Sequence, residues 1–368
     1  MEYQGVRNWE GLLDPLDDTL RSEIIRYGHF VDAAYKAFDF DISSPSYASC
    51  RYPKSSLFER SGFARTGFRL TRNLRATSGI RLPPWVERAP AWMATQSSWI
   101  GYVAVCQDKD EISRLGRRDV VVAFRGTATC LEWLENLRAT LAPVPNAGSG
   151  GTETEPMVES GFLSLYTSGT ETSPSLQTLV REEIKRLLQS YGDEPLSLTI
   201  TGHSLGAALA TLTAYDIKTT FSRAPLVTVI SFGCPRVGNG SFRRCLEKQG
   251  TKVLRIVNSD DPITKVPGFV IDKRPNNRPE MAMASSGSLP TWIGRSVEQT
   301  QWVYADVGRE LRLSSRDSPY VAGGNVAVCH DLKTYLHLVN GFVSSGCPFR
   351  ATAKRMKMMK KKKTGTAA

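Results

Sequence analysis

Among the residues that could take part in a reaction, one serine between two glycines has the most informative sequence context. Ser204 is the centre of a Gly-x-Ser-x-Gly pentapeptide, Gly202 to Gly206. A run rich in β-branched residues, 196–201, precedes the pentapeptide, and a run rich in Ala and Leu follows it. Strand, tight turn and helix in this order form a nucleophile elbow, which exposes the serine Oγ at the end of a sheet. The pattern predicts acyl-transfer chemistry at Ser204. A serine that merely caps a helix is the simpler alternative.

A serine hydroxyl becomes a good nucleophile when a histidine, itself oriented by a carboxylate, removes its proton. The chain has four histidines, and in the order that accompanies such elbows the histidine follows the serine. This order leaves His330 and His337. We favour His330, where a loop turns into a predicted helix, because His337 falls inside that helix and suits a packing role. His203 lies within the elbow and is expected to point away from the serine oxygen, and His29 belongs to an early amphipathic helix.

The carboxylate is expected between the serine and the histidine, at the end of a strand. The apolar run 252–257 reads as such a strand, and Asp260 and Asp261 follow it closely. Either aspartate could orient the histidine. We prefer Asp261, which directly precedes Pro262, and Asp260 would then be a turn residue.

An oxyanion hole needs two donors near the serine. The N–H of Leu205, the residue after the nucleophile, supplies one in an elbow. The second is predicted at Thr127, which follows the apolar strand 119–124 and a Gly turn. An amphipathic helix is expected over 128–141, either as a lid over the site or as an ordinary packed crossover helix.

Strands and helices alternate along most of the chain, which predicts an α/β fold with a mostly parallel central sheet and helices on both faces. The predicted strands are 99–106, 119–124, 196–201, 227–232 and 252–257, with a weaker edge pair 302–306 and 310–313. The predicted helices are 174–190, 205–220, 238–249 and 331–344.

The N-terminal part is expected to pack on the same domain. A helix is predicted over 18–38, and residues 42–95 read as an irregular, wrapping segment. Two Gly-, Ser- and Pro-rich stretches, 143–156 and 272–290, are expected to be surface loops. The predicted organisation is an N-terminal segment 1–95, a catalytic core 96–345 and a basic, disordered tail 346–368.

Composition narrows the class of protein. No window of the 368 residues approaches the apolar length that spans a membrane, and the polar start does not read as a secretory signal. Seven scattered cysteines form no CxxC pair and no Cys/His cluster, which favours reduced thiols over disulfides or a zinc site. These features predict a cytoplasmic protein unless a targeting peptide lies upstream.

The net charge of +11 is concentrated at the C-terminal end, where residues 354–363 carry seven positive charges. Apolar residues lie among these lysines, so the tail is a candidate for peripheral contact with an anionic lipid surface. A solvated tail is the alternative. No recognised nucleic-acid module accompanies it, so we expect no nucleic-acid partner.

With these residues in hand, the chain resembles the class 3 lipase family of the α/β-hydrolase fold. The resemblance rests on Arg125-Gly126-Thr127, the Gly202 to Gly206 elbow, Asp261 to Pro267 and His330. More narrowly the chain is similar to the plastid-type plant phospholipases A1. That likeness rests on 9–17, 99–105 and 330–338, and it extends from about residue 8 to 353.

The resemblance implies cleavage of the sn-1 acyl ester of glycerolipids (phospholipids, galactolipids or triacylglycerol) at a membrane or lipid-droplet surface, without cofactor. It implies plastid localisation, although no transit peptide is visible in this chain. Two alternatives stay open: a soluble carboxylesterase on the same fold, and a catalytically silent lipid-binding protein.

Overall fold

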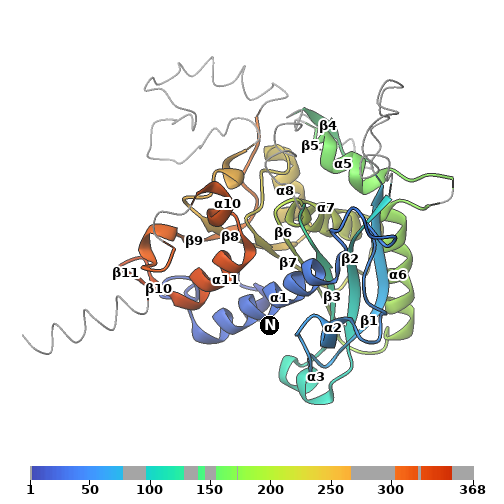
Figure 1. The fold of residues 1–368 in the computed structure, drawn as a ribbon, viewed down its shortest axis with the longest axis horizontal. Helices are drawn as coiled ribbons and strands as arrows, with labels where there is room; N and C mark the ends of the chain where they lie inside the picture. Colours follow the sequence, from blue (N-terminus) through green and yellow to red (C-terminus); the bar gives the residue numbers. More distant parts are fainter. Residues whose placement is uncertain are drawn as a thin grey trace, which may run out of the picture.

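A seven-stranded sheet forms the centre of the protein. The computed structural model describes residues 2–77, 97–127, 140–145, 155–171, 173–266, 303–321 and 325–349 (Figure 1). The strand order across the sheet is β1-β2-β3-β6-β7-β8-β9. The strands are β1 (Phe68–Thr77), β2 (Ser97–Cys106), β3 (Arg118–Phe124), β6 (Leu196–His203), β7 (Leu226–Phe232), β8 (Lys252–Asn258) and β9 (Arg309–Leu313). No helix among these residues has the length and apolarity needed to cross a bilayer.

The sheet changes from antiparallel to parallel at β3. β1, β2 and β3 pair antiparallel in sequence, with the short helix α3 (Lys109–Leu115) between β2 and β3. From β3 onward each neighbouring pair is parallel. The mostly parallel α/β sheet predicted from the sequence is therefore confirmed, and the carboxyl ends of β3, β6, β7 and β8 lie along one edge.

Helices cover both faces of the sheet because the buried strands are apolar on both sides. In β3, Val120 and Val122 pack into one hydrophobic cluster, and Val121 and Ala123 pack into the other. The first cluster contains α5 (Ser160–Thr167), α6 (Leu176–Ser190), α7 (Leu205–Thr220) and α8 (Gly240–Lys248). The second contains α1 (Asp18–Ala37), α2 (Leu57–Arg60) and α11 (Leu332–Gly341). Figure 1 shows α1 and α11, from opposite ends of the chain, side by side on that face.

Helix α1 begins and ends close to the predicted positions. The Asp17 side chain caps it by accepting hydrogen bonds from the Thr19 and Leu20 N–H groups, each at 2.9 Å. Its buried side includes Leu20, Ile24 and Phe30. Tyr35, near its last turn, is only half-buried and reaches toward the elbow, as described below.

Several sequence predictions differ from the structure. Residues 347–349, expected to belong to a disordered tail, form a short strand that pairs with 342–344, which were expected to end the helix 331–344. Residues 68–77, expected to be irregular, form the edge strand β1, whose two register shifts break the two-residue alternation that would have revealed it. The described part of the predicted strand 302–306, residues 303–306, does not pair with β9: Ala305 forms a bridge to Gly238, and β9 pairs with β8. The helix predicted over 128–141 cannot reach its expected end, because Leu141 begins a strand.

Smaller elements complete the described part. The hairpin strands β4 (Leu141–Pro143) and β5 (Met157–Glu159) pair antiparallel, as do β10 (Phe342–Ser344) and β11 (Cys347–Phe349). The short helix α10 (Val326–Cys329) precedes α11. The predicted lid helix, up to residue 139, most of the loop 143–156, the whole loop 272–290 and the tail from residue 350 lie outside the described residues.

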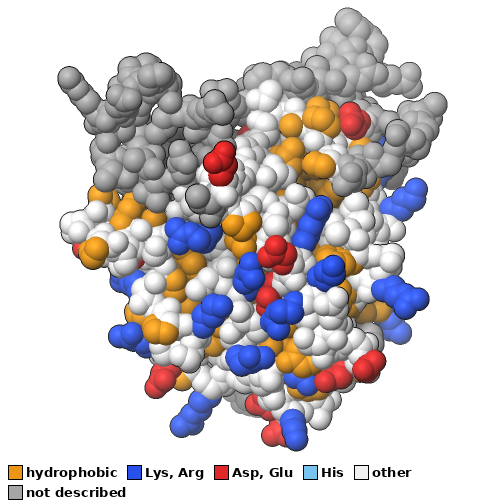
Figure 2. All heavy atoms as spheres, turned by 90° about the vertical axis from the view of Figure 1, so that its right-hand side faces the viewer, with side chains coloured by type: hydrophobic (Ala, Val, Ile, Leu, Met, Phe, Trp, Pro, Cys, Tyr) orange, Lys and Arg blue, Asp and Glu red, His pale blue; other side chains and the backbone are white. Residues whose placement is uncertain are grey.

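The exposed edge of the sheet carries arginines rather than apolar side chains. In β1, Arg69 is exposed, and Arg72 and Arg75 are half-buried. Figure 2 looks at the side where β1 and α6 lie and shows Lys and Arg side chains spread across it, with Asp and Glu between them. Charged side chains at an edge strand oppose pairing with another chain.

Candidate active site

The predicted elbow lies between β6 and α7. Ser204 follows β6 directly and is the residue before the first turn of α7, with φ +57° and ψ −127°. A non-glycine residue at positive φ stores about 1–3 kcal/mol of strain and persists where its surroundings hold it. The Ser204 N–H bonds to the Phe232 carbonyl of β7 at 3.0 Å, which fixes the turn to the sheet.

Both glycines of the pentapeptide are required by close backbone contact. A Cβ at Gly202 would lie 2.3 Å from the Gly206 oxygen, and one at Gly206 would lie 2.4 Å from the Arg125 oxygen. The loop after β3 is equally close, because a Cβ at Gly126 would lie 3.0 Å from the Ser204 Cβ. Gly126 therefore touches the residue predicted to be the nucleophile.

The structure brings Asp261 and His330 together. His330 Nδ1 lies 2.6 Å from Asp261 Oδ2 although 69 residues separate them in sequence. Asp261 is completely buried and His330 is 2% exposed. The second carboxylate oxygen, Oδ1, accepts the Ile263 N–H at 2.9 Å, so both oxygens are occupied. His330 Nε2 is buried and has no hydrogen-bond partner among the described residues. It is therefore the ring nitrogen left to exchange a proton.

His330 is placed by two short elements rather than by one helix start. It is the C-cap of α10, and α11 begins two residues later at Leu332. Its own N–H bonds back to the Val326 carbonyl at 3.0 Å. The sequence prediction of a loop that turns into a helix missed the single helical turn before it.

Two residues that sequence reasoning missed hold the aspartate. The Tyr335 hydroxyl donates to Asp261 Oδ2 at 2.6 Å, and it accepts the Asn258 N–H at 3.3 Å. Burial and the negative charge of Asp261 raise the pKa of Tyr335 well above its ordinary value, so it stays a donor. Asn258, at the end of β8, also donates to the Cys329 carbonyl at 2.9 Å. Tyr335 comes five residues after the histidine, within the stretch 330–338 that carries the family likeness, but that likeness did not by itself indicate a contact with the aspartate.

Asp260 points elsewhere. Its Oδ1 lies 2.8 Å from Arg316 Nε, and its Oδ2 accepts the Ser314 hydroxyl at 2.8 Å. Of the two aspartates left open by the sequence, only Asp261 faces the histidine. His337 bonds to Ser318 at 3.0 Å, and His29 packs on Phe63, so both lie outside this cluster.

The two predicted oxyanion donors lie at the start of α7 and on the loop after β3. Leu205 is the first residue of α7, so its N–H has no acceptor within the helix. Thr127 follows Gly126, which touches Ser204, and its Oγ1 is buried without a hydrogen-bond partner among the described residues. An unsatisfied buried hydroxyl is unfavourable unless a ligand completes it.

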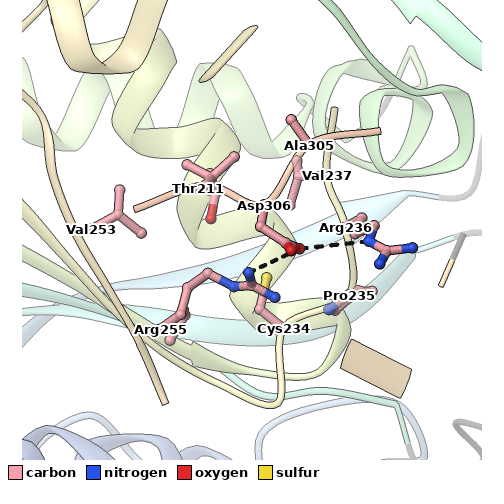
Figure 3. Close-up of a pocket in the computed structure, with 11 residues that line it drawn as sticks. Thr211, Cys234, Pro235, Arg236, Val237, Val253, Arg255, Ala305 and Asp306 are labelled. Atoms are coloured by element: carbon pink, nitrogen blue, oxygen red, sulfur yellow. Dashed lines mark ion pairs between the residues drawn. The ribbon is translucent and has the colours of Figure 1, made fainter. Parts of the chain in front are cut away.

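Three charged side chains, Arg236, Arg255 and Asp306, lie together (Figure 3), and Arg236 bonds to the loop after Asp261. Asp306 Oδ1 lies 2.9 Å from an Arg255 terminal nitrogen and 3.5 Å from Arg236 Nε. Arg236 bonds through its guanidinium to the Lys265 carbonyl and through its N–H to the Val266 carbonyl, the latter at 2.8 Å. The cavity between these side chains has a volume of about 10 Å³, room for no more than about one water molecule. We assign it a structural role.

The cluster contains the parts that an acyl-transfer site requires. A strained serine, a buried Asp–His pair with one free ring nitrogen, and unsatisfied donors occupy neighbouring strand ends. Among the described residues, no group of three or more His, Cys, Asp or Glu side chains is arranged to hold a metal ion.

Comparison with known proteins agrees with this geometry. The family model described as lipase (class 3) matches residues 121–271. Phospholipase A(1) DAD1, chloroplastic, of Arabidopsis thaliana is 71% identical over 360 residues, which cover 97% of this chain and 79% of that protein. Galactolipase DONGLE, chloroplastic, from the same plant is 40% identical over 353 residues, 92% of this chain and 69% of that protein. The solved structure of a Rhizomucor miehei lipase–propeptide complex shares the fold, with a TM-score of 0.50, 15% identity, and coverage of 90% of this chain and 81% of that one.

Proposed function

Because the chain belongs to the class 3 lipase family, within its plant phospholipase A1 group, and is thus a lipid acyl hydrolase, we propose that it cleaves the sn-1 acyl ester of glycerolipids. The observation that carries the proposal is the buried Asp261–His330 pair, at 2.6 Å, at the same edge of the sheet as the strained serine of the elbow. The names of the relatives favour phospholipids and galactolipids as substrates.

In the proposed mechanism, Ser204 attacks the acyl carbonyl while His330 Nε2 takes its proton. Asp261 keeps the opposite ring nitrogen protonated and stabilises the imidazolium. The developing oxyanion accepts hydrogen bonds from the Leu205 N–H and from Thr127. The imidazolium then protonates the departing lysolipid oxygen, and the acyl group stays on the serine. Water, deprotonated by the same histidine, releases the fatty acid and restores the serine.

Product analysis by mass spectrometry tests this reaction. Liposomes of phosphatidylcholine or monogalactosyl lipid, with different acids at sn-1 and sn-2, are given to the protein and to its Ser204→Ala variant. Release of the sn-1 acid by the wild type alone is the expected result. Cleavage of p-nitrophenyl butyrate without any lipid hydrolysis would instead indicate a soluble carboxylesterase, and inactivity on every ester would indicate a lipid-binding protein.

We propose further that the protein acts in plastids and that the lysine-rich segment 354–363 contacts anionic lipid. The plastid location is supported by the relatives, which are named as chloroplastic proteins. The lipid contact is supported by the positive charge of the segment. Flotation with phosphatidylcholine vesicles, with and without phosphatidylglycerol, compares the full chain with a chain ending at residue 353. Binding that depends on both the segment and the anionic lipid is expected. Equal binding of the two chains would refute the role of the segment.

A further inference from the structure

His203, the second residue of the pentapeptide, is held by hydrogen bonds at both ring nitrogens. Its Nε2 lies 2.7 Å from the His330 carbonyl oxygen, and its Nδ1 lies 2.7 Å from the Tyr35 hydroxyl. The ring is 4% exposed. It points at the backbone of the residue proposed as the base.

The hydrogen bonds through Tyr35 and His203 form a hydrogen-bond chain. The position of each hydrogen atom in it can be assigned from the atoms that can only accept or only donate. A carbonyl oxygen can only accept, so His203 Nε2 carries a hydrogen and donates it to His330. The Gly126 N–H lies 2.9 Å from the Tyr35 oxygen and can only donate. In the neutral imidazole Nδ1 is then an acceptor, and the Tyr35 O–H donates to it. Every donor meets an acceptor: Gly126 to Tyr35, Tyr35 to His203, and His203 to His330.

This hydrogen-bond chain joins the two sides of the proposed site. One end is Gly126, which touches Ser204 and precedes Thr127; the other end is the main chain of His330. Tyr35 reaches this hydrogen-bond chain from α1, through its hydroxyl. We propose that Tyr35 and His203 are positioning residues that set the distance between the oxyanion loop and the catalytic base, an inference that rests on the function proposed above.

The physical reason is the narrow geometry that proton transfer tolerates. A shift of about 1 Å in a reacting group can reduce the rate roughly a hundredfold. In the proposed mechanism His330 must present Nε2 to Ser204, and since His330 is the C-cap of the one-turn helix α10, its main-chain position decides where that nitrogen lies. His203 fixes the His330 carbonyl, and Tyr35 fixes His203 relative to Gly126.

Ring packing alone is the competing explanation. The His203 and His330 ring centroids are 4.7 Å apart, and those of Tyr35 and His203 are 5.8 Å apart. Tyr35→Phe separates the two explanations because it keeps the ring and removes only the hydroxyl. Packing predicts unchanged turnover, whereas positioning predicts a lower kcat.

Steady-state kinetics with p-nitrophenyl butyrate test the proposal in Tyr35→Phe, His203→Gln and the double variant. The matched control is Tyr102→Phe, which removes another tyrosine hydroxyl that bonds to α1, at the Phe30 carbonyl at 2.7 Å, away from the site. Losing one link should lower kcat roughly tenfold with KM within about twofold. The double variant should fall no further than the weaker single variant. Since Gln can still donate to the His330 carbonyl, His203→Gln should retain more activity than His203→Leu.

Several outcomes would overturn the proposal. One is a kcat of Tyr35→Phe equal to that of Tyr102→Phe at similar melting temperatures, and another is full additivity in the double variant. A measurement that needs no variant of the chain is nitrogen NMR of the 15N-histidine-labelled protein at pH 7.5. It should show His203 as the neutral tautomer protonated at Nε2. A charged ring or the Nδ1 tautomer would contradict the proposed hydrogen-bond chain.

A failure of the proposed function would give different results from a failure of the positioning proposal. In that case wild-type protein hydrolyses no ester, and a fluorophosphonate does not label Ser204. If the wild type is active and labelled while Tyr35→Phe matches it, only the positioning proposal fails.

Discussion

The Tyr335 hydroxyl and the His330 Nδ1 atom share one acceptor, Asp261 Oδ2, each at 2.6 Å. The tyrosine and the histidine stand five residues apart, one in α11 and one just before it. A single carboxylate oxygen therefore orients the proposed base and ties it to the helix that follows.

Removing the Tyr335 hydroxyl should lower turnover. In Tyr335→Phe the carboxylate keeps His330 but loses a hydrogen bond to a charged group, worth about 1.5–3 kcal/mol. We expect kcat to fall about tenfold or more with KM little changed, measured with p-nitrophenyl butyrate. The matched control is Tyr166→Phe, in which a buried tyrosine loses its bond to Asp216 at 3.1 Å, away from the site. Equal kcat values for the two variants would remove Tyr335 from the mechanism.

The two neighbouring aspartates should differ sharply. Asp261→Asn offers His330 an amide in place of a carboxylate and should lower kcat on the order of 10³- to 10⁴-fold, as in other serine triads. Asp260→Asn loses a pair with Arg316, whose side chain is 85% exposed, and should leave kcat within about twofold. Kinetics of the two purified variants decide the matter. A large loss in Asp260→Asn would reassign the acid.

Thr127→Val should change activity and stability in opposite directions. The hydroxyl is buried without a described partner, so its removal should leave the free energy of unfolding unchanged or raise it. Activity should fall, by less than the roughly 2.7–4 kcal/mol of barrier that a complete oxyanion donor supplies, because the backbone N–H remains. Thr251→Val is the control: it removes another unpartnered buried hydroxyl, just before the start of β8 and at the opposite end of that strand from Asp261, and should leave kcat unchanged. Thr127→Ser should restore activity, and a fully active Thr127→Val would exclude the side chain.

Stability should depend on pH through His203. Burial, and next the charge of nearby His330, lower the pKa of His203 well below 6.5, whereas the unfolded chain has an ordinary histidine there. The stabilisation is complete above about pH 6.5 and is lost as the pH falls, because only the unfolded state takes up the proton. The free energy of unfolding should therefore be lower at pH 5.5 than at pH 7.5.

Urea unfolding of the wild type and of His203→Gln at the two pH values measures this effect. Other groups whose pKa values differ between the states, such as His29, are common to both proteins and cancel. The groups that face His203 are Tyr35, His330 and Tyr335. The wild type should lose the extra stability and His203→Gln should not. Parallel losses would show that His203 takes up a proton in the folded protein.

Local patterns predicted the elbow and most of the sheet. The β-branched run, the pentapeptide and the Ala/Leu run around Ser204 each specify their own conformation, so the strand, turn and helix could be assigned from sequence neighbours alone. The order of Ser204, Asp261 and His330 predicted the members of the site, and the structure places Asp261 and His330 in contact. Their catalytic roles remain predictions.

Contacts between distant parts of the chain could not be read in this way. Tyr335 and Tyr35 follow the apolar spacing of their helices, so the sequence indicated only that they are buried, and their hydroxyl partners lie 74 and 168 residues away. β1 was missed because its register shifts erase the strand periodicity. Its assignment depends on pairing with β2, which is a property of the folded sheet.

The position of α1 beside α11 bears on how far this enzyme can be shortened. Residues 121–271, by which the family is recognised, contain Ser204 and Asp261 but neither His330 nor Tyr35. A fragment trimmed to that match would also lose the two strands that cover one edge of β3. A fragment made for crystallisation, or an elbow grafted onto another scaffold, would therefore have to include both α1 and α11, which come from opposite ends of the sequence and pack against each other.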